Sequence, residues 1–118
     1  MKIKAQQNDH FVSLNEIIFV FKNKNMNYFW KLKNIELTMN SSFDGDLFKL
    51  EKDSELENGV DFSGKELQEL SWQIKQVING LFIAFDSSGI EKIKIEMFDS
   101  SFWDISGDDV YLIENHFK

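Results

Sequence analysis

The chain contains no cysteine and no arginine, and none of its apolar runs is long. Without cysteine it can form neither disulfides nor thiolate metal sites, and two histidines alone are too few for a structural zinc site. No apolar run approaches the length of a transmembrane helix, and residues 1–10 are too polar for the core of a signal peptide. No glycine-rich phosphate-binding loop occurs. We therefore expect a cytoplasmic protein that uses no cofactor and no membrane anchor.

The missing arginine also limits the kinds of partner. All 13 cationic residues are lysines, and the formal net charge is −7. Recognition of phosphates and bases relies heavily on the planar guanidinium of arginine, and an acidic chain repels a polyanion. Direct binding of nucleic acid is therefore not expected. Negative charge keeps any small protein in solution, but it also speeds the encounter with a basic protein, which is the partner that this composition favours.

The clearest secondary-structure signals describe a helix followed by strands. Ser63-Gly64-Lys65-Glu66 has the form of a capping box at a helix start, and Asn79-Gly80 offers a left-handed helix end. The apolar residues between them recur at helical spacing: Leu67, Leu70, Ile74, Val77 and Ile78. These features predict a helix over 63–79. Two strands are predicted to follow, near 81–86 and 90–98, because the second alternates apolar with charged residues.

The N-terminal part gives a more ambiguous pattern. Ser13-Leu14-Asn15-Glu16 again suits a helix start, but residues 17–21 are rich in strand formers. Of the two readings we favour a helix over 14–23. Residues 28–37 predict a strand whose alternation slips by one position between Leu32 and Ile35, as it does at a β-bulge.

The acidic segment and the C-terminal part complete the pattern. Phe48-Lys49-Leu50 alternates like a short strand, and residues 51–61 hold so few apolar anchors that we expect them to be the most mobile part. Phe85-Asp86-Ser87-Ser88 recurs as Phe98-Asp99-Ser100-Ser101, which predicts two similar turns of a meander. A last strand over 102–105 and a C-terminal helix should follow.

Together these elements predict a single domain over residues 1–118 of the α+β class, with a largely antiparallel sheet packed against two or three helices. A chain of this length has room for one core. The expected core consists of apolar residues at inward-facing positions: Trp30, Leu32, Leu67, Leu70, Ile74, Ile78, Phe82, Ile93, Ile95, Met97 and Ile113.

No catalytic or metal-binding motif is complete. Asp99, His116 and either Ser100 or Ser101 supply the residue types of a Ser–His–Asp triad, but no nucleophile-elbow sequence surrounds the serines. Asp44-Gly45-Asp46 with Glu51 offers oxygen ligands, but the other ligands of an EF-hand loop are missing. We therefore predict a protein that is not an enzyme and holds no metal.

Trp72 departs from the apolar face of the predicted helix. On a helical wheel it falls well away from Leu67, Leu70 and Ile74. Either the acidic segment 41–61 folds over this side chain, which we favour because large apolar residues are usually sheltered, or Trp72 is exposed. An exposed Trp72 is a candidate binding anchor, since tryptophan is enriched at interface hot spots.

The C-terminal half carries a resemblance to known proteins. The stretch from Ile93 to Ile105 and the Asp-rich helix start after it, together with Gln76 to Ile83, resemble small bacterial immunity proteins that accompany secreted or contact-delivered toxins. The resemblance is by type, so it transfers no functional residues. It implies a compact acidic inhibitor that covers a basic toxin surface.

Charge and resemblance lead to one function hypothesis: a non-enzymatic, protein-binding inhibitor, most simply an immunity protein that neutralises a toxin. A small-molecule-binding or regulatory domain and a small hydrolase are the alternatives. Residues 41–70 hold nine acidic residues and three lysines, a balance of −6, whereas residues 1–40 hold three acidic residues and six lysines, a balance of +3. The predicted partner contact is therefore acidic, with Trp72 added if it is exposed: Asp44, Asp46, Glu51, Asp53, Glu55, Glu57 and Trp72.

Overall fold

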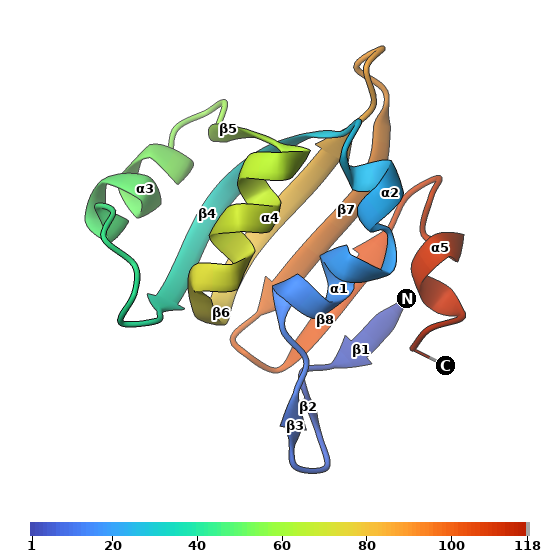
Figure 1. The fold of residues 1–118 in the computed structure, drawn as a ribbon, viewed down its shortest axis with the longest axis horizontal. Helices are drawn as coiled ribbons and strands as arrows, with labels where there is room; N and C mark the ends of the chain where they lie inside the picture. Colours follow the sequence, from blue (N-terminus) through green and yellow to red (C-terminus); the bar gives the residue numbers. More distant parts are fainter. Residues whose placement is uncertain (118) are drawn as a thin grey trace.

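The computed structural model describes residues 1–117, which form a six-stranded antiparallel sheet, a small hairpin and five short helices (Figure 1). In chain order the elements are β1 (Lys2–Lys4), β2 (Gln6–Gln7), β3 (His10–Phe11), α1 (Leu14–Val20), α2 (Lys22–Asn25), β4 (Phe29–Met39), α3 (Leu47–Ser54), β5 (Val60–Ser63), α4 (Gly64–Gln73), β6 (Ile74–Phe85), β7 (Glu91–Phe98), β8 (Phe102–Ser106) and α5 (Tyr111–Glu114). The predicted α+β class with a largely antiparallel sheet is confirmed. In the described part of the chain no helix is long and apolar enough to cross a membrane.

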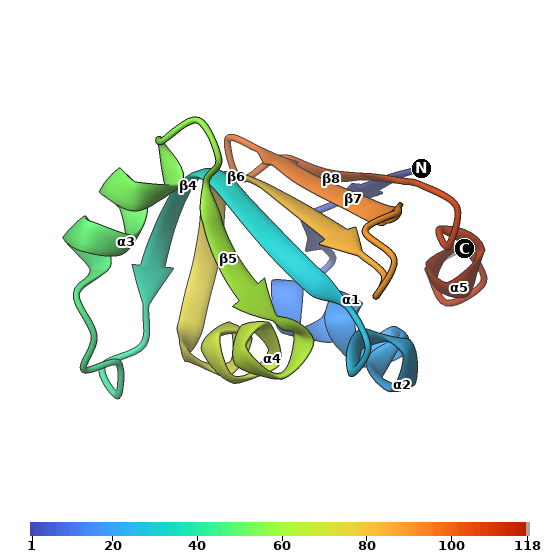
Figure 2. The ribbon, with the colours of Figure 1, turned by 90° about the horizontal axis from the view of Figure 1, so that it is seen from above.

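The strands of the large sheet follow the order β1-β8-β7-β6-β4-β5, and every neighbouring pair is antiparallel. Helices α1, α2 and α4 lie on one face of this sheet (Figure 2), and the core lies between them and the strands. Helix α3 flanks the part of β4 that the short strand β5, which begins opposite Leu32, does not cover. The opposite face of the sheet carries no helix from the described residues (Figure 2).

The core contains the residues that the sequence pattern predicts, with one exception. Trp30, Phe82 and Trp103 are among its largest fully buried side chains. Ile78 is only partly buried, whereas its neighbour Val77 is buried. The side chains of a strand alternate between the two faces, so a strand that buries Val77 turns Ile78 to the other side.

The predicted helix over 63–79 is too long. The capping box at Ser63 and Glu66 is present, but α4 ends at Gln73, and the backbone of Ile74 is already extended. The helix prediction buries Ile74 and Val77 because residues three apart share a helix face. Both residues are also buried in the strand, because the strand pairing is irregular at this point. Residues 74–85 are rich in strand formers and adopt strand conformation. The residues predicted as the end of the helix and the predicted strand 81–86 therefore form one long strand, β6.

Asn79-Gly80 therefore does not end a helix but lies inside β6, opposite an irregularity in β4. The bulge predicted between Leu32 and Ile35 is confirmed by a register shift between Lys33 and Glu36, with Asn34 in the left-handed region at φ 51°. A Cβ on Gly80 would lie 3.0 Å from the Ile35 side chain, so glycine allows the two strands to approach here.

The acidic segment contains a helix that the pattern does not reveal. Asp46 caps α3 by accepting a hydrogen bond from the Lys49 N–H at 3.0 Å, so the predicted strand at residues 48–50 is wrong. Two side chains of the segment are fastened to β4: Glu51 accepts from the Leu37 N–H at 2.9 Å and Ser54 accepts from the Ile35 N–H at 3.1 Å. Residues 51–61 do hold few apolar anchors, but these two hydrogen bonds attach the first part of the segment to the sheet, which the apolar pattern could not show.

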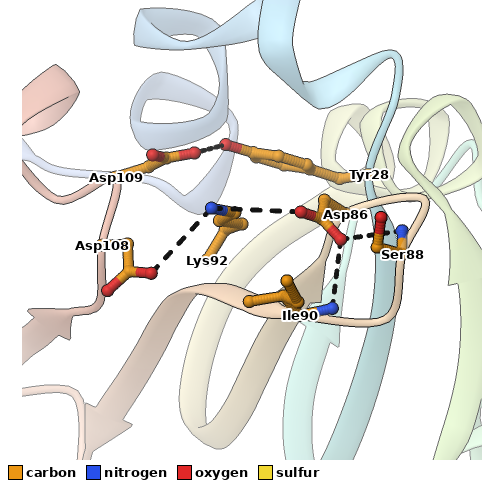
Figure 3. A network of polar contacts seen from close by, with 7 residues as sticks. All are labelled: Tyr28, Asp86, Ser88, Ile90, Lys92, Asp108 and Asp109. Carbon is orange, nitrogen blue, oxygen red and sulfur yellow. Dashed lines mark hydrogen bonds and ion pairs between the residues drawn. The ribbon is translucent and has the colours of Figure 1, made fainter.

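The N-terminal helix is confirmed, although it is divided into α1 and α2 by a break at Phe21. The turn predicted after Phe85 is present (Figure 3), where the Asp86 carboxylate accepts hydrogen bonds from the Ser88 and Ile90 N–H groups. These bonds, chiefly the one from Ile90, hold the pKa of Asp86 below its usual value. The predicted last strand is present as β8.

A cluster of polar contacts connects the start of the C-terminal region with the end of the sheet. The Tyr28 hydroxyl donates a hydrogen bond to the buried carboxylate of Asp109, and Lys92 Nζ lies 3.9 Å from both Asp86 and Asp108 (Figure 3). Burial and this hydrogen bond raise the pKa of Tyr28, so its hydroxyl keeps its proton and remains a donor. Asp108 and Asp109, which make these contacts, lie just before α5, which begins at Tyr111.

Candidate functional site

The predicted acidic contact lies on α3 and the loops beside it, but several of its side chains already have partners. Asp46 caps the helix and Glu51 holds β4, as described above. Asp53 forms an ion pair with Lys49 at 2.7 Å, and Glu55 lies 3.9 Å from Lys52.

Asp44 and Glu57 are exposed on either side of α3. Over residues 44–57 six acidic residues face two lysines, so the segment carries −4. It therefore provides a negative field over one side of the molecule, but Asp46 and Glu51 serve chiefly to build the fold.

Trp72 is exposed, with 63% of its surface accessible. The prediction that the acidic segment covers this side chain is wrong, because α3 packs against β4 and β5. Trp72 instead borders a hollow of about 590 Å³, which we call the Trp72 hollow; its lining residues are Asn15, Glu16, Phe19, Val20, Lys22, Trp72 and His116. Phe19, on α1, is also exposed, at 54%. Two large aromatic side chains from different helices thus meet solvent at one place.

The two helices that carry these aromatic residues are fixed at their starts and joined near Trp72. Ser13 caps α1 by accepting from the Glu16 N–H at 3.1 Å, and the capping box fixes the start of α4. The Asn15 side-chain amide donates to Ser71 Oγ at 3.0 Å, one residue before Trp72. These bonds set the separation of α1 and α4, so the hollow is part of the folded structure.

Charged groups surround the aromatic centre of the Trp72 hollow. The Lys22 ammonium lies 4.3 Å from the centre of the Phe19 ring, and His10 contacts the Glu16 carboxylate at 2.7 Å. An exposed aromatic centre with a polar rim is the usual composition of a protein-binding hot spot.

The acidic segment begins beside this hollow. Asn40, which follows β4, donates its backbone N–H to the Gln73 carbonyl at 2.8 Å and its side-chain amide to the Trp72 carbonyl at 3.2 Å. These bonds place Trp72 near the first residues of the acidic segment, whereas α3 itself lies beside Ile35 and Leu37 of β4.

A second hollow, of about 610 Å³, lies where β4 begins and β5 ends; we call it the β5 hollow. Its lining residues are Phe29, Trp30, Lys31, Asp61, Phe62, Ser63, Glu66, Phe85, Asp86, Ser87 and Gly89. None of them belongs to the predicted site. A small-molecule site requires an apolar hollow with a few polar groups. For the alternative of a small-molecule-binding domain, the β5 hollow is therefore the place where the ligand would bind.

The residues of the hypothetical triad serve other contacts. Ser100 Oγ accepts from the Gln76 side chain at 3.0 Å, and Ser101 Oγ donates to the Asp99 carbonyl at 3.3 Å. His116 borders the Trp72 hollow, and no hydrogen bond within residues 1–117 links it to either serine. Likewise, no group of three histidine, aspartate or glutamate side chains in that range is placed to hold a metal ion.

Trp72 is the one lining residue of the Trp72 hollow that the sequence analysis predicted as a site residue; it missed the exposed Phe19 and considered His116 only for a catalytic triad. Leu14, Ile17, Ile18 and Phe21 are buried, so a helical wheel for residues 14–21 would have left Phe19 on the outer face. Nothing in the sequence places His116 beside Trp72, because the two are distant along the chain. Comparison with protein-family models, with curated proteins and with solved structures gave no match for this chain.

Proposed function

We propose that this chain is a non-enzymatic, protein-binding inhibitor that acts in the cytoplasm by neutralising a basic toxin domain, as bacterial immunity proteins do. The observation that carries the proposal is the exposed pair Trp72 and Phe19 around one hollow of an acidic protein. Exposed tryptophan supplies a large contact area with few rotatable bonds, which suits the centre of an interface.

The charge of the chain supports a basic partner. The formal charge is −7, and Asn40, four residues before the −4 segment 44–57, donates a hydrogen bond to the Trp72 carbonyl. Such a field raises the association rate with a positively charged protein, whereas burial of the aromatic side chains slows dissociation. We therefore expect the acidic segment to control the association rate of the partner and Trp72 to control the dissociation rate of the complex.

The test begins with the reading frame next to this one in its genome. Its product is expressed in a bacterial host, with and without this chain, and growth is recorded. We expect the neighbour alone to stop growth and the pair to grow. A neighbour that is harmless, or that kills equally in the presence of this chain, contradicts the toxin-neutralising function.

Kinetic measurements on the purified pair then test the surface. Trp72→Ala should speed dissociation by about 30-fold or more, the effect of a hot spot of about 2 kcal/mol. Phe48→Ala is the matched control, because Phe48 is exposed but lies on α3, outside the hollow. Equal dissociation rates for the two variants would show that the partner docks elsewhere.

The combined variant Asp53→Asn, Glu55→Gln, Glu57→Gln tests the role of the acidic segment. It should slow association at low ionic strength and lose this effect near 1 M salt, where the Debye length is about 3 Å. Its dissociation rate should equal that of the wild type. An association rate that does not change at low salt contradicts electrostatic steering by this segment.

A further inference from the structure

The β5 hollow combines aromatic rings with carboxylates. Phe29 lies in one row of the sheet between Ser63 of β5 and Phe85 of β6, its two directly opposed neighbours. Phe29 is 58% exposed, and Phe85 and Phe62 are partly buried beside it. Directly opposed residues of antiparallel strands stand about 5 Å apart, and both Phe29 and Phe85 line the hollow.

Three carboxylates line the same hollow, and each has an oxygen that accepts no hydrogen bond within residues 1–117. Asp61 uses one oxygen to bind Lys31 at 2.8 Å, and Glu66 uses one to accept from the Ser63 N–H at 2.8 Å. Asp86 accepts its two turn bonds through Oδ1, and its Oδ2 lies 3.9 Å from Lys92 Nζ, so Asp61 and Glu66 supply the oxygens that are available to a ligand.

The charge of the β5 hollow indicates which kind of ligand it can bind. Asp61, Glu66 and Asp86 oppose Lys31 within the lining, which gives a balance of −2. Lys92 is not part of the lining but lies 3.9 Å from Asp86, and with Lys92 counted the balance is still −1. The faces of aromatic rings also carry negative partial charge. Both features favour a cation and disfavour a carboxylate or phosphate.

We propose that the β5 hollow binds the guanidinium group of an arginine side chain presented by another polypeptide. A guanidinium is planar and weakly hydrated, stacks on aromatic rings and pairs with carboxylates through two parallel hydrogen bonds, whereas an ammonium is a strongly hydrated point charge. The chain itself has no arginine, so the occupant comes from a different molecule.

The surroundings favour a polypeptide over the free amino acid. The hollow borders β5, which within residues 1–117 is an edge strand paired with β4 alone, and an exposed edge strand can pair with an added peptide strand. The α-carboxylate of free arginine would meet the negative lining, whereas a peptide-bonded arginine has none. The inference does not depend on the Trp72 hollow or on the identity of a toxin.

The test is an NMR titration of the ¹⁵N-labelled chain with Nα-acetyl-argininamide at low salt. We expect saturable shifts of the Asp61, Ser63 and Gly89 amide signals with a Kd on the order of millimolar. Nα-acetyl-citrullinamide, which has nearly the same shape without the charge, should give no saturable shift. Free L-arginine should bind more weakly than the capped probe.

Variants of Phe29 separate the cation–π contact from simple apolar burial. Phe29→Leu keeps an apolar side chain but removes the ring, and it should weaken binding of the capped arginine about two- to fivefold. Phe29→Trp should strengthen binding, since tryptophan is the best cation–π partner. The control is Trp72→Ala, which should leave this affinity unchanged even though it disrupts the proposed toxin contact.

Each contrary outcome overturns the inference. Equal binding of the citrulline probe would show that charge plays no part, and unchanged affinity in Phe29→Leu would exclude the ring. Tighter binding of free L-arginine would identify a small-molecule site. Shifts confined to the Trp72 hollow would locate the arginine contact there, and the β5 hollow would then have no role in it.

Discussion

Glu51 offers the clearest test of whether the acidic segment serves the fold or a partner. Its carboxylate accepts the Leu37 N–H at 2.9 Å, at the part of the β4 edge that β5 does not reach. Glu51→Ala removes this acceptor, and hydrogen bonds to charged groups contribute roughly 1.5–3 kcal/mol. Because water can reach part of this edge, we expect a loss of about 1–3 kcal/mol in the free energy of unfolding.

Urea denaturation measures this loss. With a slope of about 1–3 kcal/mol per molar urea for a small protein, the midpoint should fall by roughly 1 M. Glu51→Gln should lose less, because its amide oxygen still accepts the bond. Glu55→Ala is the control. Glu55 is exposed and makes a weak surface contact with Lys52 at 3.9 Å, so its replacement should change stability by less than about 0.5 kcal/mol. If Glu51→Ala and Glu55→Ala are equally stable, Glu51 has no structural role.

Three further changes test other parts of the fold. Gly64→Ala would place a Cβ 1.7 Å from the Asn25 carbonyl oxygen, and we expect a loss of about 1–3 kcal/mol by urea denaturation, whereas Gly45→Ala meets only the end of the Phe43 ring and should be nearly neutral. Ile74→Ala should lose roughly 2–5 kcal/mol through lost burial and a cavity, and a cost as small as that of a surface substitution would contradict its position in the core. Asp86 has a lowered pKa, so its contribution to stability is present above the unfolded value of 3.8 and disappears as the pH falls through the folded value. Asp86→Asn should therefore be less stable than the wild type at pH 7 and lose less stability on acidification, and parallel pH–stability curves would contradict this.

The sequence predicted best where local patterns and tertiary packing agree. The alternation of β7, the caps at Ser13 and Ser63 and the bulge in β4 all appear in the structure, because each depends on neighbours within a few residues. The junction after Gln73 could not be found in this way. Ile74 suits the buried side of either element, and only pairing with Met39 of the distant β4 makes it a strand residue.

The same limit explains the acidic segment and the two hollows. Leu47 and Leu50 pack on the core at helical spacing, but with Phe48 between them the segment also reads as a short strand. The Trp72 hollow joins α1, α4 and the C-terminal region, and the β5 hollow joins three strands, α4 and a turn. Residues brought together from such distant segments leave no local signal.

The position of β1 has a consequence for how the chain folds during synthesis. Among the described residues β1 pairs in the sheet with β8 alone, so Ile3 stands opposite Trp103, about 100 residues later. The Trp103 indole also donates to the Val12 carbonyl at 3.0 Å. A ribosome adds roughly 5–20 residues per second, so the first strand waits for several seconds without a partner. During that interval the backbone N–H and C=O groups of β1 have no strand partner, and the six-stranded sheet is complete only after β8 has been made.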